Sequence, residues 1–273
     1  MTDTGGLERI DTSVAHPARR YNYWLGGKDN FAADRESGDA IAKVYPAIRT
    51  TALENRAFLR RAVQYLAEEA GIRQFLDIGT GIPTADNTHE VAQSIAPDSR
   101  IVYVDNDPIV LTHARALLSS TPQGATAYID ADLRDPAAIL AHDSVRQTLN
   151  FDEPIALMLI AIVHFLFDEH HPRETVRHLI DALPPGSYVV MTHGTSDFAD
   201  PALRAHVEAE IRAGRLRLDA VPRSKDEIAA FLEGLDIVEP GIAPVVEWRN
   251  PVPESDRPPL ADAALYAVVA RVP

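Results

Sequence analysis

The stretch Phe75-Leu76-Asp77-Ile78-Gly79-Thr80-Gly81 decides the fold. It predicts a buried strand that ends in a carboxylate and runs into a tight glycine turn before a helix. Glycines let the backbone approach a ligand closely because they carry no Cβ, and the first amides of a helix can donate to ligand oxygens. The carboxylate of Asp77 disfavours a pyrophosphate and favours an amine or a sulfonium. We therefore expect a nucleoside-bearing ligand with a cationic tail at this turn.

Strand-like and helix-like segments alternate after this stretch. Strands are expected at residues 73–78, 100–104, 125–130, 154–163 and 187–192, with two closing strands near 235–248 and 263–272. Helices are expected at 84–96, 108–119, 136–142 and 173–183, and near 201–213 and 225–234. The pattern predicts an α/β fold with a Rossmann-like, doubly wound sheet of seven strands, mostly parallel with the last strand antiparallel.

The part before the sheet is expected to form an N-terminal helical extension, residues 1–70, ahead of a ligand-binding domain, residues 71–273. Apolar positions from Ile48 to Leu66 recur with helical spacing, and Gly71 is expected to end that helix. An earlier segment is polar and aromatic around a glycine pair. Such a segment suits a lid that covers a ligand and stacks on it; the alternative is a segment that docks on the sheet edge. The candidate lid and substrate residues are Tyr21, Tyr23, Trp24, Gly26, Gly27 and Asn30.

Composition narrows the classes of function. The 273 residues carry a formal net charge of −14 and include no cysteine. Disulfides, thiolate zinc sites and cysteine nucleophiles are therefore excluded, and the acidic balance argues against nucleic acid or an anionic membrane as partner. No signal peptide and no apolar run of about 18 residues is visible. We expect a cytoplasmic protein.

Three acids follow three successive predicted strands. Asp77 ends the first strand, Asp105 ends the second, and Asp132 follows the third. A carboxylate in the second position can accept both ribose hydroxyls, and one in the third can accept from an exocyclic adenine amine. Asp107 is expected instead to cap the helix that follows. A nicotinamide oxidoreductase is disfavoured, because Asp77 repels phosphate and Thr84 stands where a dinucleotide site needs its third glycine.

These residues resemble the class I S-adenosylmethionine-dependent methyltransferases from about residue 72 to 273. Asp77, Gly79 and Gly81 match the first motif of that superfamily, although Pro83 stands where many members have a third glycine. A narrower resemblance rests on residues 21–34 (YNYWLGGKDNFAAD), 77–84 (DIGTGIPT) and 87–91 (NTHEV). These motifs resemble a bacterial S-adenosyl methyltransferase family long catalogued as a domain of unknown function. The resemblance implies S-adenosyl-L-methionine as cofactor, bound by Asp77, Gly79, Thr80, Gly81, Asp105, Asn106, Asp132, Leu133 and Ala161.

Two histidines are candidates for a general base, because His164 and His193 follow the fourth and fifth strands. The alternative is that each packs or bonds locally. No metal site is expected: the acids and histidines at 168–171 are interpreted as the exposed start of a helix. The stretch at 161–164 lacks the Asn/Asp-Pro-Pro-Tyr pattern of nucleobase amino-methyltransferases. We expect O- or N-methylation of a small molecule; the alternative is a non-catalytic S-adenosylmethionine-binding or regulatory protein.

Overall fold

A mixed sheet forms the centre of the molecule. The structure, a computed structural model, describes residues 11–117, 120–202, 204–205, 209, 213 and 219–273. The strands follow the order β3-β2-β1-β4-β5-β8-β6, and β7 also pairs with β8. Their bounds are β1 Gln74–Ile78, β2 Arg100–Asp105, β3 Ala125–Asp130, β4 Ala156–Ile160, β5 Tyr188–Gly194, β6 Asp236–Ile237, β7 Ala243–Pro244 and β8 Leu265–Arg271.

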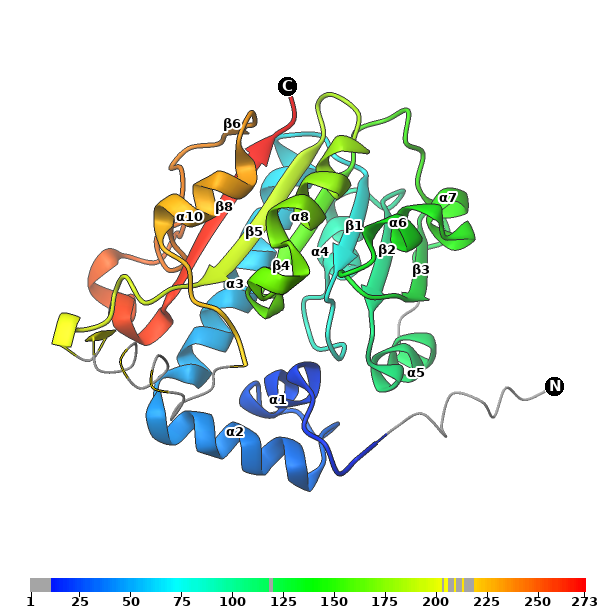
Figure 1. Ribbon diagram of the computed structural model, residues 1–273. Helices are drawn as coiled ribbons and strands as arrows, with labels where there is room; N and C mark the ends of the chain where they lie inside the picture. Colours follow the sequence, from blue (N-terminus) through cyan, green and yellow to red (C-terminus); the bar gives the residue numbers. More distant parts are fainter. Residues whose placement is uncertain (1–10, 118–119, 203, 206–208, 210–212, 214–218) are drawn as a thin grey trace.

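The first five strands run parallel and β8 runs antiparallel to β5. The carboxyl ends of the parallel strands therefore meet at one edge, which Figure 1 shows facing α1. The pairing register places Asp105 opposite Asp130 at the ends of β2 and β3. A ligand in such a sheet binds beyond this edge, where strand order reverses between β1 and β4.

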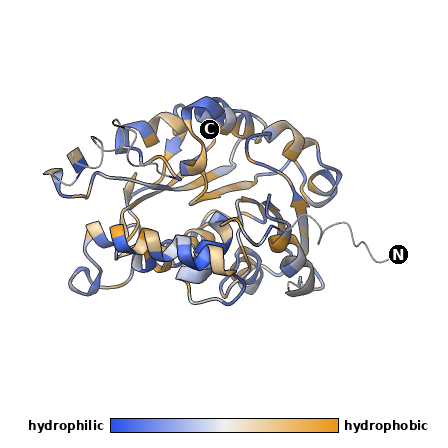
Figure 2. Cartoon of the chain, turned by 60° about the horizontal axis from the view of Figure 1, so that its bottom comes forward, coloured by the Kyte–Doolittle hydropathy of each residue, from blue (hydrophilic) through white to orange (hydrophobic). Residues whose placement is uncertain are grey.

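Two layers of helices cover the two faces of the sheet (Figure 2). On one face, apolar side chains of α3 (Ile48–Glu68) and α4 (Thr88–Ile95) pack against the strands. On the other face the covering helices are α6 (Pro136–Ala141), α7 (Asp143–Thr148), α8 (Pro172–Asp181) and α10 (Lys225–Ala229). The central strands β1 and β4 are buried along their whole length, as their apolar sequences require when both faces are covered.

Two further helices, α1 (Pro17–Trp24) and α2 (Ala32–Val44), lie below the carboxyl edge of the sheet in Figure 1. Helix α5 (Pro108–Leu117) begins beside them after β2. Short 3₁₀ segments connect the rest: Val163–Phe165, Asp168–His170, Ala230–Leu232, Glu254–Asp256 and Leu260–Ala263. None of the helices in the described ranges is long and apolar enough to cross a membrane.

The doubly wound α/β prediction is confirmed, with three local differences. The helix expected from residue 84 begins only at Thr88, because Asn87 caps it and the Asn87 N–H donates to the Glu90 carboxylate. The strand expected at 235–248 is divided into β6 and β7, because Pro240 and Gly241 interrupt it and Gly241 has φ 91°. Pairing of both pieces with β8 raises the strand count to eight. Most of the helix expected at 201–213 lies outside the described residues.

Candidate functional site

The glycine turn after β1 is held against the end of β2. The amides of Gly79 and Thr80 donate to the Val104 carbonyl at 2.8 and 3.3 Å, and Gly79 and Gly81 have φ of 76° and 68°. A Cβ on Gly79 would lie 2.5 Å from Cγ1 of Ile162, whereas a Cβ on Gly81 would meet nothing within 4 Å. Gly79 is therefore required by the close approach of Ile162. At Gly81 the turn borders open space, as a ligand cradle requires.

Asp105 closes the turn from the neighbouring strand. Its Oδ2 accepts from the Gly81 amide at 2.8 Å and its Oδ1 accepts from the Asp107 amide at 2.9 Å. Burial of this carboxyl, which is 7% exposed, raises its pKa. Each carboxylate oxygen retains further acceptor capacity. The same carboxylate can thus shape the turn and accept hydroxyl groups of a ligand.

Asp77 lies beneath the turn and is almost completely buried. Its Oδ2 accepts from the Thr88 hydroxyl at 2.6 Å at the start of α4. Burial raises the pKa of Asp77 to about 6, and the Thr88 hydrogen bond and the charge of Arg56 oppose that rise. No hydrogen bond joins Oδ1 to the described part of the chain. The carboxylate therefore links β1 to α4 and keeps one oxygen available.

The predicted adenine-contacting residues gather after β3. Asp132 is held by Arg134, whose hydrogen bond lowers the pKa of Asp132 to about 2. Asn106 reaches it from the end of β2, with Nδ2 donating to Asp132 Oδ2 at 2.9 Å. Leu133 is buried in the core. The structure therefore brings Asp105, Asn106 and Asp132 together at one edge, with an ionised carboxylate at its outer end.

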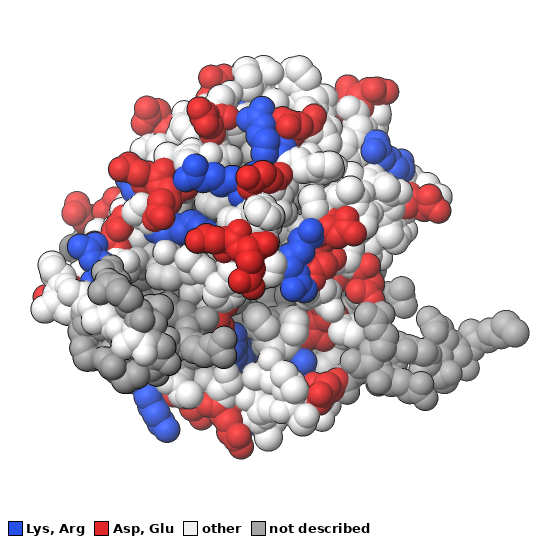
Figure 3. Space-filling model, in the orientation of Figure 1, with Lys and Arg blue, Asp and Glu red and all other residues white. Residues whose placement is uncertain are grey.

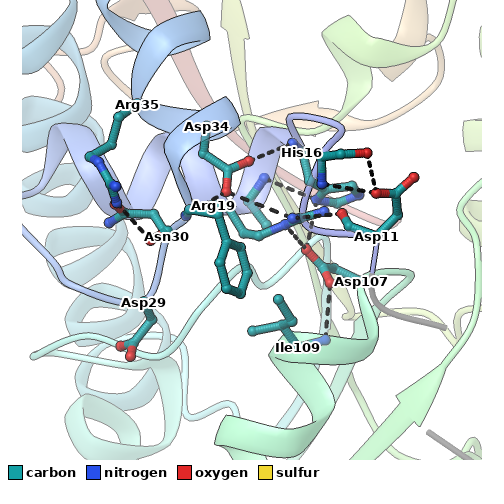
Figure 4. Close-up of polar contacts among 12 residues, drawn as sticks. Asp11, His16, Arg19, Asp29, Asn30, Asp34, Arg35, Asp107 and Ile109 are labelled. Atoms are coloured by element: carbon teal, nitrogen blue, oxygen red, sulfur yellow. Dashed lines mark hydrogen bonds and ion pairs between the residues drawn. The ribbon is translucent and has the colours of Figure 1, made fainter. Parts of the chain in front are cut away.

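Helices α1 and α2 form a folded cap over this edge. Arg19 of α1 donates from Nε to Asp107 Oδ2 at 3.0 Å, and its Nη1 lies 3.7 Å from Asp34 Oδ2 (Figure 4). Ala18 and Phe31 of the cap pack against Ile82 of the glycine turn and against α5. Asp107 also accepts from the Ile109 amide, which confirms its predicted capping role at α5.

The aromatic residues of the predicted lid mostly join helices of the cap to each other. Trp24 Nε1 donates to the Gly38 carbonyl of α2 at 3.3 Å, and the Tyr23 hydroxyl bonds Asp39 at 2.8 Å. Tyr21 instead bonds α3, where its hydroxyl donates to the Ala52 carbonyl at 3.0 Å. The glycine pair forms a tight turn rather than an open hinge. A Cβ on Gly27 would lie within 2.5 Å of the amide group of Asn22.

Asn30 belongs to the same turn. Its Nδ2 donates to Asn22 Oδ1 at 2.9 Å and to the Gly27 carbonyl at 3.0 Å. Gly26 precedes this turn with φ 80°. These contacts give Gly26, Gly27 and Asn30 a role in shaping the cap. A contact between these residues and a substrate stays a prediction.

The two candidate bases lie side by side, with ring centroids 5.7 Å apart. His193 uses both nitrogens: Nδ1 bonds the Gly194 carbonyl at 2.8 Å, and Nε2 bonds Nη1 of Arg223 at 3.0 Å. His164 Nδ1 accepts weakly from the Gly194 amide at 3.4 Å, which leaves the proton of the neutral ring on Nε2. Burial lowers the pKa of His164 to about 3 and that of His193 to about 4. Both rings are neutral at pH 7.

No role for Arg56 was predicted from the sequence. From the helical periodicity alone, it is an ordinary charged residue of α3. Its Nη2 donates to the carbonyls of Ala85 and Asp86 at 2.8 and 3.0 Å. Its charge also lowers the pKa of Asp77. Arg56 therefore steadies the end of the glycine turn and places a cation near the Asp77 carboxylate.

The segment at 168–171 leads into α8. His171 takes a left-handed conformation immediately before Pro172, and His170 Nδ1 accepts from the Phe167 amide at 3.1 Å. Across the described ranges, no three His, Cys, Asp or Glu side chains are grouped to hold a metal ion.

Comparison with known proteins assigns this geometry to a family. The model of the S-adenosyl methyltransferase family matches residues 3–273. The chain belongs to the S-adenosyl methyltransferase family. Its cofactor is S-adenosyl-L-methionine, and the open cradle at Gly81 and the acids at three strand ends fit a nucleoside with a cationic tail.

Two solved structures are similar over nearly the whole chain. A DUF574 family protein from Streptomyces avermitilis is 49% identical, with a TM-score of 0.89 over 97% of this chain and 100% of that one. A putative methyltransferase from Thermobifida fusca is 41% identical, with a TM-score of 0.85 over 99% and 98%. An O-methyltransferase family protein from Burkholderia thailandensis is 16% identical, with a TM-score of 0.51 over 88% and 62%, and shares the fold. None of the curated proteins matches this sequence.

The glycine turn of this methyltransferase family member yields a matched pair of substitutions. Gly79→Ala should lower the free energy of unfolding by about 2–5 kcal/mol, since strain at positive φ adds to a clash with Ile162. Gly81→Ala carries only the strain and should cost about 1–2 kcal/mol, while its Cβ should weaken S-adenosylhomocysteine binding at least about tenfold. Urea unfolding and titration calorimetry measure the two effects. Equal losses of stability would contradict the Ile162 contact.

Asp77 should make stability depend on pH in a definite direction. Its folded pKa of about 6 exceeds the unfolded value of about 4, so the protonated form is the one that folding favours. Wild-type stability relative to Asp77→Asn should therefore be greatest below about pH 4 and should fall as the pH rises to about 7, by about 3 kcal/mol in all, and then level off. Urea unfolding of both proteins at each pH measures this difference. A difference that stays constant with pH would show that the carboxyl is not buried.

Proposed function

We propose that this protein transfers the methyl group of S-adenosyl-L-methionine to an oxygen or nitrogen atom of a small molecule. One observation carries the proposal: Asp77, Asp105 and Asp132 follow three neighbouring parallel strands beside the cradle at Gly81. Asp105 would accept the ribose hydroxyls. Asp132, with Asn106 and the backbone at Leu133, would hold the adenine. A nicotinamide dinucleotide would place its pyrophosphate against the carboxylate of Asp77, and the two negative charges would repel each other. This repulsion favours S-adenosylmethionine over a dinucleotide.

The amino-acid part of the cofactor would lie between Asp77 and Arg56. Asp77 offers its second carboxylate oxygen to an ammonium, and Arg56 carries the charge that suits a carboxylate. We expect backbone groups of Gly79, Thr80 and Gly81 to border the bound tail on one side, and Ala161, directly after β4, to border it on the other. Oppositely charged groups placed for both ends of an amino acid favour a zwitterionic tail.

Bound S-adenosylmethionine supplies an electrophilic methyl group, and the protein supplies position. Holding a nucleophile in line with that methyl group can contribute about 7–11 kcal/mol without any proton transfer. His164 and His193 are weak bases, since burial lowers both pKa values far below 7. The proton on His164 Nε2 would serve to orient an acceptor atom by hydrogen bonding. An already ionised oxygen suits this hydrogen bond best, because it keeps lone pairs free for the methyl group; a neutral amine has one lone pair and would attack without that hydrogen bond.

The acceptor would enter between the cap and the carboxyl edge of the sheet. We assign the lid role to the N-terminal extension predicted at 1–70, as far as the structure describes it from residue 11, and expect residues 194–202 and 219–224 to help build the substrate pocket; the rest of the predicted 194–224 segment lies largely outside the described residues. Acidic and basic side chains are interspersed over the described residues of the face in Figure 3, without a continuous basic band. With a net charge of −14, this surface favours a small molecule in the cytoplasm over nucleic acid or a membrane.

The weak bases also keep a second candidate open, a binding or regulatory protein that holds S-adenosylmethionine without turnover. The two functions share the cofactor and differ in product. Incubation with S-adenosylmethionine and a library of small amines, phenols and carboxylic acids separates them: release of S-adenosylhomocysteine that depends on one acceptor supports the enzyme. Tight binding with no release across all three chemical classes would favour the binder.

Substitution of Asp105 tests the cofactor assignment. Asp105→Ala should weaken S-adenosylhomocysteine binding by about 100-fold or more, because two ribose hydroxyls lose a charged acceptor. Asp98→Ala is the matched control, since Asp98 is an exposed acid that only approaches Arg73 at 3.7 Å. Calorimetry should find its affinity unchanged. Unaltered affinity in Asp105→Ala would place the ribose elsewhere.

Replacement of the two histidines by phenylalanine should have different effects, on turnover for His164 and on stability for His193. His164→Phe should lower turnover of an identified acceptor at least about tenfold while cofactor affinity stays within about threefold, because it removes only an orienting hydrogen bond. His193→Phe should chiefly lower the melting temperature, because Arg223 and the Gly194 carbonyl lose a buried partner. Steady-state kinetics and thermal melts measure both. A pure loss of stability in His164→Phe would exclude a role in the reaction.

A further inference from the structure

Ala161, the residue directly after β4, has a backbone conformation that a residue with a Cβ rarely adopts. Its φ is 52°, in the left-handed region. Such a conformation persists only when surrounding contacts enforce it. The next residue, Ile162, then lies over the glycine turn, where a Cβ on Gly79 would meet its side chain at 2.5 Å. The backbone at Ala161 therefore sets one wall of the cofactor site.

A series of hydrogen bonds, fully buried where Thr192 meets Asn55, reaches this strained residue from the cap. The Ala161 amide donates to Thr192 Oγ1 at 2.8 Å, and the Thr192 hydroxyl donates to Asn55 Oδ1 at 2.7 Å. Asn55 Nδ2 donates to the Tyr21 hydroxyl at 2.9 Å, and that hydroxyl donates to the Ala52 carbonyl at 3.0 Å. We call Ala161, Thr192, Asn55 and Tyr21 the relay. It joins β4, β5, α3 and α1.

Each hydrogen bond in the relay has a fixed donor and a fixed acceptor. Because the Thr192 hydroxyl donates to Asn55, only its lone pairs remain for Ala161. Because Asn55 turns its oxygen toward Thr192, only its amide N–H groups remain for Tyr21. Thr192 is 0% exposed and Asn55 is 2% exposed, so water cannot replace a lost partner, and an unpaired group there is costly. Loss of one member therefore disturbs the pairing of the others.

We propose that Asn55 is a positioning residue that couples docking of α1 to the left-handed conformation of Ala161. When α1 is docked, the Tyr21 hydroxyl fixes the Asn55 amide group, and Asn55 in turn fixes Thr192 beneath Ala161. When α1 lifts, this support is released and the wall formed by Ile162 loosens. The expected effect on cofactor binding rests on the proposed function, but the coupling between α1 and Ala161 does not.

Hydrogen exchange in the ligand-free protein tests the coupling from both ends. Tyr21→Phe should speed exchange of the Ala161 amide about fivefold, although its own partner Thr192 is untouched, since one neutral hydrogen bond is worth about that factor. Thr192→Val should speed exchange of the α1 amides by a similar factor. Tyr23→Phe is the matched control: it removes a hydroxyl from the same helix, but one bonded to exposed Asp39. It should leave Ala161 unchanged.

Further variants separate a relay from local damage. Thr192→Ser keeps the hydroxyl and should restore wild-type exchange in α1, which also guards against a Thr192→Val protein that folds poorly. The double variant Tyr21→Phe/Thr192→Val should exceed the larger single effect by less than about twofold, because one break already interrupts the relay. Exchange that rises only beside each substituted residue, or effects that multiply in the double variant, would overturn the proposal.

Cofactor affinity provides an independent measurement. Tyr21→Phe should weaken S-adenosylhomocysteine binding about fivefold in titration calorimetry. Tyr266→Phe, which removes a β8 hydroxyl bonded to Asp197 and is not a candidate lid or site residue, should leave the affinity unchanged. A wild-type protein that binds no S-adenosylhomocysteine would refute the cofactor assignment and leave the exchange result to decide the relay. Remote changes in exchange without any change in affinity would overturn the link between the relay and the site.

Discussion

The buried guanidinium of Arg19 holds the cap on the sheet. It stands between Asp34 and Asp107, and each of these acids serves the start of a helix. Asp34 accepts from the Phe31 amide at the start of α2 and from the His16 amide at the start of α1, while Asp107 accepts from the Ile109 amide in α5. Three helix N-termini thus converge on one ion-paired group (Figure 4).

The electrostatics explain why this arrangement is stable. The positive ends of helices favour carboxylates, and two carboxylates in a buried place require a cation. Arg19 is 6% exposed and Asp34 is 0% exposed, so removal of the guanidinium would leave the buried Asp34 without its cation and Asp107 with only His16 Nδ1, at 3.1 Å, beside it. Breaking a buried pair of this kind typically costs about 3–5 kcal/mol. The ion pairs of Arg19 therefore help to hold the cap over the carboxyl edge of the sheet, together with the packing of Ala18 and Phe31 and the Tyr21 hydrogen bond to Ala52.

Acids in the site also shape it before any ligand arrives. Asp105 fixes Gly81 and the start of α5, and Asp77 fixes the start of α4 through Thr88. The groups assigned to ligand binding are thus held by hydrogen bonds that the folded protein already makes. This preorganisation reduces the ordering that binding would otherwise require.

Local sequence signals predicted the strands and the glycine turn, because each depends on residues a few positions apart. The apolar run at 155–160 and the Asp77–Gly81 motif are of this kind. The start of α4 was misplaced because a reciprocal cap at Asn87 and Glu90 outweighs the helix-forming residues before it. The relay was beyond prediction. Asn55 and Thr192 are 137 positions apart, and nothing in their neighbours indicates that α3 and β5 share a hydrogen bond.

The same distinction bears on catalysis. Sequence position placed His164 and His193 at strand ends, where bases often stand, yet their partners decide what they can do. Arg223 and the Gly194 carbonyl occupy both nitrogens of His193, and the amide of Gly194 directs the proton of His164 to Nε2. A site with these two rings is better suited to holding a nucleophile than to deprotonating one. Methyl transfer from a sulfonium requires little more, because the donor is already activated and the remaining barrier is largely one of alignment. For the proposed methyl transfer, the positions of the strand ends, of Ala161 and of the cap above it would therefore matter more than the strength of any base.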